Sequence, residues 1–242
     1  MDRLTHSAFS GMRSAMAAQT VTANNLANAS TTGFRRDFAE IRALAAGEQG
    51  RDARMFANER AMTADMTPGA MVTTNRALDV AMQDRALLAV QAPDGTEAYT
   101  RRGDLSVEAS GLLVNGAGHP VLGADGPITI PAAEAIMIAP DGLVSVRPEG
   151  GTPIDLIEVG RLKLVTPADD LRRDNDLFRA EDDLIADPAA RLSSGTLEGS
   201  NVNSADALVN LVEQARRFEM NVGLLTTARE LDQAGASLLR QE

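Results

Sequence analysis

The sequence predicts an α+β protein: long N- and C-terminal helices that form an α-helical, coiled-coil-like domain, with a central antiparallel all-β domain. Two observations support this fold class. Apolar residues recur at helical spacing at both ends of the chain, and short apolar runs separated by turn dipeptides fill the middle. We expect an N-terminal helix and assembly segment over 1–36, an extended linker over 37–70, the β domain over 71–196 and the C-terminal helix over 197–242.

The composition is that of a folded, soluble protein. Its 242 residues are enough to bury a core, and 44% hydrophobic with 24% charged residues argue against a disordered chain. A formal net charge of -11 repels the phosphate backbone, which argues against nucleic-acid binding. No apolar run is long enough to cross a bilayer, so we expect no membrane insertion.

The N-terminal helix is expected from about Leu4 to Ala27, with two neighbouring apolar stripes. The first has small side chains at heptad spacing: Leu4, Ala8, Gly11, Ala15, Ala18, Thr22 and Asn25. The second is bulkier: Phe9, Met12, Met16, Gln19, Ala23 and Leu26. So broad an apolar face favours more than one neighbour, and burial in the core of one domain is the alternative. Gly33 predicts the end of this segment.

The segment 37–70 has no clear period and ends in a Thr67-Pro68-Gly69 turn, so we predict a partly extended linker. Its methionines, Met55, Met62 and Met66, are loosely spaced. We interpret them as gap-filling side chains, with a methionine-lined ligand groove as the alternative.

From about residue 71 to residue 167, alternating apolar runs such as Leu78, Val80 and Met82 predict antiparallel strands. Hairpin turns are predicted at four dipeptides: Asp94-Gly95, Asn115-Gly116, Asp125-Gly126 and Asp141-Gly142. The stretch 169–187 that follows is strongly acidic. It lacks the ligand spacing of a calcium-binding loop, so we predict a solvated acidic surface there.

The C-terminal helix is expected to begin near Asn203, whose side chain can accept a hydrogen bond from the N–H of Asp206. Its apolar residues repeat at spacings of three and four: Leu208, Leu211, Ala215, Phe218, Val222 and Leu225. At about 1.5 Å per residue, a helix over 204–239 would reach about 54 Å. A helix of that length needs a partner, and we expect the N-terminal helix to be that partner.

Two segments at opposite ends of the chain resemble the signatures of flagellar rod and hook proteins. The N-terminal signature is residues 23–35, Ala-Asn-Asn-Leu-Ala-Asn-Ala-Ser-Thr-Thr-Gly-Phe-Arg, and the C-terminal signature is residues 197–203, Leu-Glu-Gly-Ser-Asn-Val-Asn. Blocks at 78–82, 99–103 and 115–123 are similar to the β domain of this family. The short central region is most similar to proximal-rod members, with distal-rod and hook subunits as alternatives. Ala86-Leu87-Leu88 departs from the family pattern of a glycine followed by aromatic residues.

This resemblance implies a structural subunit of the flagellar basal-body rod that polymerises through its terminal helices and transmits torque. The implied partners are other rod subunits, copies of itself and the flagellar type III export apparatus. The implied location is the periplasmic rod. The N-terminus lacks the pattern of a cleaved signal peptide, which agrees with export by that apparatus.

The residue pattern and the resemblance together predict the assembly interface. Asn24, Asn25 and Asn28 are expected to pair across helices and set their register, with helix capping as the alternative. The full predicted set is Leu4, Ala8, Gly11, Ala15, Ala18, Asn24, Asn25, Leu26, Asn28, Gly33, Phe34, Leu208, Leu211, Ala215, Phe218, Val222 and Leu225.

We expect no catalytic site, cofactor or metal. The chain has no cysteine and no glycine-rich phosphate loop, and its only histidines are His6 and His119. His119 is interpreted as a surface turn residue. A carboxylate-dependent hydrolase is the alternative from another functional class, because Asp and Glu are plentiful.

Overall fold

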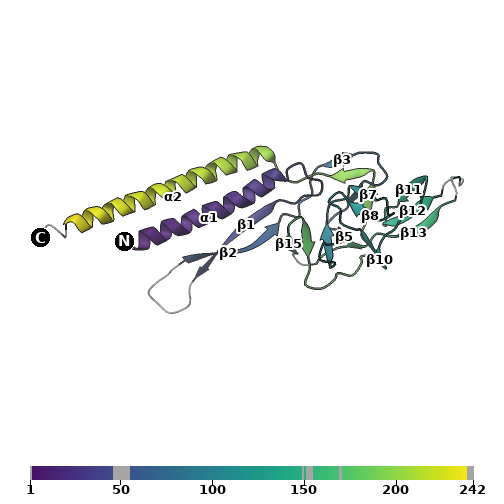
Figure 1. Cartoon of the computed structure of the whole chain (residues 1–242), viewed down its shortest axis with the longest axis horizontal. Helices are drawn as coiled ribbons and strands as arrows, with labels where there is room; N and C mark the ends of the chain where they lie inside the picture. Colours follow the sequence, from purple (N-terminus) through teal and green to yellow (C-terminus); the bar gives the residue numbers. More distant parts are fainter. Residues whose placement is uncertain (1, 46–54, 149, 151–154, 169–170, 239–242) are drawn as a thin grey trace. The chain divides into compact units, whose positions relative to one another are not determined.

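The computed structural model describes residues 2–45, 55–148, 150, 155–168 and 171–238 (Figure 1). The chain divides into two compact units. The helical unit contains the described residues of Met1–Ala27, Asp37–Met62 and Asn203–Glu242. The β unit contains Asn28–Arg36 and Thr63–Val202. Helices and antiparallel strands are thus largely segregated, which confirms the α+β class.

Two helices dominate the helical unit, α1 (Asp2–Ala27) and α2 (Ser204–Leu238), and they lie side by side (Figure 1). The predicted start of α2 is confirmed, because the Asn203 Oδ1 accepts hydrogen bonds from the N–H groups of Ala205 at 3.0 Å and Asp206 at 3.4 Å. The predicted partner of α2 is also confirmed.

The segment 37–70, expected to be an extended linker, contains paired strands. β1 (Asp37–Ala45) and β2 (Met55–Ala64) form a two-stranded sheet, and β1 packs beside α1. Of the three methionines singled out there, Met66 packs against a buried apolar cluster of the β unit, as a gap-filling residue would. The side chains of the other two lie outside the described ones.

Among the described residues, the β unit contains the end of β2 and all of the strands β3 to β18. Every described strand pairing is antiparallel. β2 ends in this unit, and the next strands are β3 (Met71–Thr73), β4 (Val80–Met82), β5 (Leu87–Gln91), β6 (Glu97–Thr100), β7 (Leu105–Val107), β8 (Leu113–Asn115), β9 (Leu122–Gly123) and β10 (Gly126–Pro127). The remaining strands are β11 (Ala135–Ile138), β12 (Leu143–Arg147), β13 (Ile157–Arg161), β14 (Leu164–Val165), β15 (Arg172–Asp174), β16 (Leu177–Arg179), β17 (Leu192–Ser194) and β18 (Thr196–Glu198).

The largest sheet has five strands in the order β14-β5-β6-β16-β15, and β11-β12-β13 form a second sheet. Two of the predicted hairpin turns connect β5 to β6 and β11 to β12, where Gly95 and Gly142 take positive φ angles of 84°. The last strands return to the first ones: β18 pairs with β3, β17 with β4 and β14 with β5.

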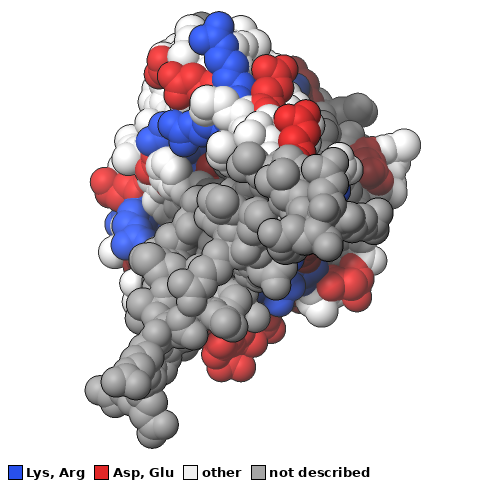
Figure 2. All heavy atoms as spheres, turned by 90° about the vertical axis from the view of Figure 1, so that its left-hand side faces the viewer, with Lys and Arg blue, Asp and Glu red and all other residues white. Residues whose placement is uncertain are grey.

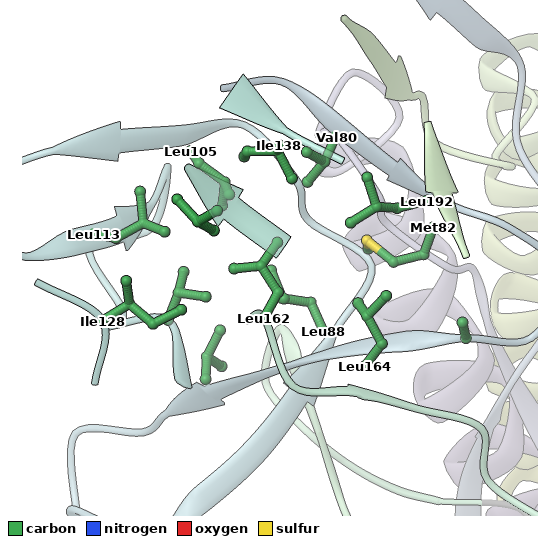
Figure 3. Close-up of a cluster of buried hydrophobic side chains, with 14 of the residues drawn as sticks. Val80, Met82, Leu88, Leu105, Leu113, Ile128, Ile138, Leu162, Leu164 and Leu192 are labelled. Carbon is green, nitrogen blue, oxygen red and sulfur yellow. The ribbon is translucent and has the colours of Figure 1, made fainter. Parts of the chain in front are cut away.

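The core of the β unit is made of aliphatic side chains that point toward one another (Figure 3). β5 lies between two buried clusters. Leu88 and Val90 belong to the larger cluster, whereas Leu87 and Ala89 belong to a smaller one around Tyr99 and Phe178. Ala86-Leu87-Leu88 is therefore fully buried, and aliphatic residues fill the place that the family pattern gives to aromatic ones.

Leu88→Ala is expected to lower the free energy of unfolding of the β unit by about 2–5 kcal/mol, because it leaves a cavity in a close-packed core. The matched control is Ile185→Ala. Ile185 is 90% exposed, so its loss should change stability by less than about 0.5 kcal/mol. Urea unfolding followed by circular dichroism measures both. Equal losses for the two variants would contradict the described core.

Candidate assembly interface

The small stripe of α1 faces α2 within the same chain. A Cβ placed on Gly11 would lie 3.1 Å from the Oδ1 of Asn221, and Ala15 is buried. Farther along, the Gln214 Nε2 donates a hydrogen bond to the Thr22 Oγ1 at 2.9 Å. The side chains of Leu4 and Ala8 lie outside the described ones. The described part of the small stripe thus lets α1 and α2 approach closely.

On each helix, the face that points away from the contact between α1 and α2 carries exposed apolar side chains. On α1, Phe9 is 55% exposed and Met16 is 53% exposed. At about 100° per residue, α2 likewise has one exposed apolar face opposite the side that meets α1. We call these exposed residues the outer faces: Phe9 and Met16 on α1, and Val209, Val212, Met220 and Leu224 on α2.

The predicted residues of α2 fall on different parts of its surface. Half-buried positions are Leu211, Ala215, Phe218 and Leu225, on the side of the helix that also carries Gln214 and Asn221. Leu208 and Val222 are exposed. The three-four repeat therefore follows the contact between α1 and α2 for most of its length.

The asparagine amides near the end of α1 make hydrogen bonds to nearby segments of the chain. Asn25 donates from Nδ2 to the carbonyl of Asp37 at 2.9 Å and accepts at Oδ1 from the N–H of Asp37 at 2.8 Å. The Asn28 Oδ1 accepts from the hydroxyl of Thr31. The Asn25 amide thus makes both of these hydrogen bonds with the backbone of β1, as a residue of a neighbouring strand would, and does not bridge the two helices. Of the other predicted residues of α1, Asn24 is exposed, and Ala18 and Leu26 are half-buried.

Three charged side chains form a buried cluster where the two signatures meet in the β unit. We call Arg35, Arg101 and Glu198 the Glu198 cluster. The Arg35 Nη2 lies 2.6 Å from the Glu198 Oε1, and the Arg101 Nη2 lies 2.6 Å from the Glu198 Oε2. All three side chains are almost fully inaccessible to solvent. One carboxylate therefore balances two buried guanidinium groups.

Arg101 also donates to backbone carbonyls around it. Its Nη1 donates to the carbonyls of Asp84 and Ala86, and its Nη2 donates to that of Met82 at 2.8 Å. Burial lowers the pKa of the Arg101 guanidinium, and the negative charge of Glu198 opposes that shift. These bonds hold the turn between β4 and β5 against the cluster.

Backbone hydrogen bonds join the two signatures directly. The N–H of Gly33 donates to the carbonyl of Glu198 at 2.7 Å, and the N–H of Asn201 donates to the carbonyl of Phe34 at 3.3 Å. The Asn201 side chain accepts from the N–H of Arg36 at 2.7 Å and donates to the carbonyl of Asp65 at 2.9 Å. The predicted residues Gly33 and Phe34 are thus buried within the β unit.

A cation–π contact supports Phe34. The Arg173 guanidinium lies 4.5 Å from the centroid of the Phe34 ring and 5.2 Å from that of Phe178. Its Nη1 also donates to the carbonyl of Arg35 at 2.8 Å. The β15–β16 hairpin therefore packs against the N-terminal signature.

The surface carries mixed charge. In the view of Figure 2, basic and acidic side chains lie interspersed among the described residues, without a large patch of one sign on that face. Within the described part of the chain, no group of three or more His, Cys, Asp or Glu side chains is arranged to hold a metal ion. His119 lies 3.8 Å from Asp176. None of the described helices has a stretch long and apolar enough to cross a membrane.

Three family profiles match the chain. The flagella basal body rod protein family matches residues 6–35, and the flagellar hook protein FlgE/F/G D1 domain matches residues 81–146. The C-terminal family of flagellar basal body rod FlgEFG proteins matches residues 193–238. These ranges cover most of α1, the centre of the β unit, and the chain from β17 to the end of α2.

Relatives match over nearly the full length. The chain is 41% identical to the flagellar basal-body rod protein FlgF of Salmonella typhimurium, with 99% of each chain covered. The chain belongs to the flagellar basal-body rod protein family. It is likewise 41% identical to FlgF of Escherichia coli, with 94% of each covered. It is 30% identical to the rod protein FlgG of Buchnera aphidicola subsp. Baizongia pistaciae, and the match covers 87% of the present chain and 90% of the Buchnera protein.

The resemblance predicted from the two signatures is therefore confirmed. What sequence reasoning missed is the Glu198 cluster, although its three residues lie in segments that resemble the family. An available signal was the position of Arg101 directly after the strand-like run Ala98-Tyr99-Thr100, two residues before Gly103. Charge in such a place requires a buried partner, but its identity depends on chain contacts across 97 residues.

Gly33 provides a test of the junction between the signatures. Its φ is +68°, and a Cβ there would lie 2.3 Å from the carbonyl oxygen of Arg101. Gly95 has a φ of +84° with open space around it. In both alanine variants, the unfavourable positive φ should lower the free energy of unfolding by about 1–2 kcal/mol. Gly33→Ala should lower it by several kcal/mol more, because the backbone at Arg101 must move to make room for the Cβ.

Thermal and urea unfolding of the two glycine variants measure this difference. The result that would contradict the described junction is a Gly33→Ala variant as stable as Gly95→Ala.

Proposed function

We propose that this chain is a structural subunit of the flagellar basal-body rod, which polymerises through the outer faces of α1 and α2. Family membership over nearly the whole chain supports the rod assignment. The observation that carries the mode of assembly is the pair of outer faces, which leave large apolar side chains in water although α1 and α2 already pack together. The role is structural and does not involve catalysis.

Burial of the outer faces provides the driving force for addition of a subunit. Removing apolar surface from water contributes about 25 cal/mol per Å², so burial of the two outer-face side chains of α1 and the four of α2 supplies a substantial free energy. Helices of neighbouring subunits would then pack against the outer faces of α1 and α2, and we propose that this packing is coiled-coil-like. The partners are other rod subunits and copies of this chain, arranged head to tail so that the assembly extends.

The junction of the signatures suits a part that transmits torque. The segments that lead to α1 and α2 are both anchored in the β unit, through Gly33 on one side and Glu198 and Asn201 on the other. A force that arrives along either segment meets backbone hydrogen bonds and a buried ion cluster. We propose that this anchoring keeps the β unit from unravelling under load.

The 41% identity to FlgF of Salmonella typhimurium and Escherichia coli, against 30% to FlgG of Buchnera aphidicola subsp. Baizongia pistaciae, favours a proximal over a distal position, within the resemblance described above. We further propose export through the flagellar type III apparatus, without a cleaved signal peptide, to the periplasmic part of the basal body.

Met220→Asp is expected to reduce incorporation into basal bodies at least about tenfold, because burial of an unpaired carboxylate costs more than 1.4 kcal/mol. Met220 is 63% exposed, so the unfolding midpoint of the isolated subunit should not change. Quantitative immunoblots of purified basal bodies, together with swimming assays, measure the effect.

Two controls separate the outer face from charge as such. Met220→Leu keeps the apolar surface, and Asn210→Asp adds a negative charge at an exposed position of α2 between the outer face and the side that meets α1. Both should incorporate normally. Normal incorporation of Met220→Asp would refute the assembly face, and a lowered unfolding midpoint would place Met220 in a contact within the subunit.

A further inference from the structure

The strand order and the buried charges of the β unit point to an order of folding. We propose that the β unit closes only when residues 190–202 dock, so that the β unit of a newly made chain stays unfolded until residue 202 has been synthesised. The closing segment contains Ala190, β17, β18 and the C-terminal signature. It acts as a chain-completion lock whose central group is the carboxylate of Glu198.

The first support is strand pairing. Among the described strands, β3 pairs only with β18 and β4 pairs only with β17. Leu192 of β17 is almost fully buried in the main cluster, beside Met82 and Leu164 in Figure 3. Without the closing segment, two early strands have no sheet partner and the core has a gap.

The second support is charge. Arg35 and Arg101 come from early parts of the chain, and both are buried against the one carboxylate that comes late. A buried cation without its partner is strongly destabilising. A β unit that closed before Glu198 arrived would therefore enclose two guanidinium groups, with backbone carbonyls beside Arg101 but without the carboxylate that pairs with both.

The third support is the N-terminal signature. The N–H of Gly33 donates to the carbonyl of Glu198, and the carbonyl of Phe34 accepts from the N–H of Asn201. The N–H of Gly69 donates to the Glu198 Oε1 at 2.9 Å. Residues at the start of the β unit thus have hydrogen-bond partners at its very end.

Contacts between such distant residues form late, because the cost of closing a long loop comes before the contacts that offset it. The β unit therefore cannot close before residue 202 has been made. A chain kept unfolded for so long is ready to be threaded through an export channel. That use rests on the proposed function, whereas the folding order does not.

Native-state hydrogen exchange on the full-length chain tests the lock. Three reporters are the N–H groups of Gly33, Val80 and Ala89, which donate to Glu198, Gly103 and Lys163. If the closing segment completes the fold, these amides exchange through one shared opening with the same dependence on denaturant. The proposal is overturned if Gly33 and the amides of β17 and β18 exchange through a partial opening while β5 and β6 stay protected.

Glu198→Gln gives a second comparison in the full-length chain. Loss of the carboxylate should lower protection across the whole β unit by one common factor, roughly a hundredfold or more. Glu134→Gln is the matched control, because the ion pair between Glu134 and Arg147 is half-exposed. Its loss should lower protection against exchange by less than about fivefold. A loss of protection confined to the neighbours of Glu198 would overturn the lock.

If Glu198→Gln does not fold, Leu192→Val supplies the same comparison through a milder change in the closing segment. A uniform drop in protection supports the lock, and a drop limited to β17 and β4 overturns it. Exchange is measured on the isolated subunit, so failure of a variant to enter the rod leaves these outcomes unaffected.

Discussion

The structure depends on one carboxylate, that of Glu198, held between the guanidinium groups of Arg35 and Arg101. A buried ion cluster contributes little net stability compared with apolar packing, but removal of its central charge leaves two unpaired cations in the interior. The cost of such a loss makes the arrangement specific. Because Arg35 lies in the N-terminal signature and Glu198 in the C-terminal one, the same interaction joins the two signature segments within the β unit.

The helical unit shows why a rod subunit can be both a folded protein and an assembly part. α1 and α2 pack against each other along one face of each helix, where small residues such as Gly11 and Ala15 permit close approach. The other sides keep Phe9, Met16 and Met220 in solvent. Folding therefore uses one face of each helix, and we propose that the second face meets a neighbouring subunit.

The existence and type of the helices could be predicted because helical periodicity is local, and so could the start of α2, where Asn203 caps the first turn. The side on which α2 meets α1 could not. Apolar residues occur around much of α2, so the repeat through Leu211 and Phe218 was interpreted as an interface between subunits. In the structure this stripe lies half-buried toward α1, while Val209 and Met220 are exposed.

By itself, the sequence determined an antiparallel β region between two terminal helices, and membership of a rod family, because turn dipeptides such as Asp141-Gly142 and the signatures are short-range patterns. Only the tertiary structure decided that β1 pairs with β2 and that Glu198 joins Arg35 to Arg101. These features are contacts between residues far apart in the chain. Their free energy comes from burial and charge pairing in three dimensions, which no local pattern records.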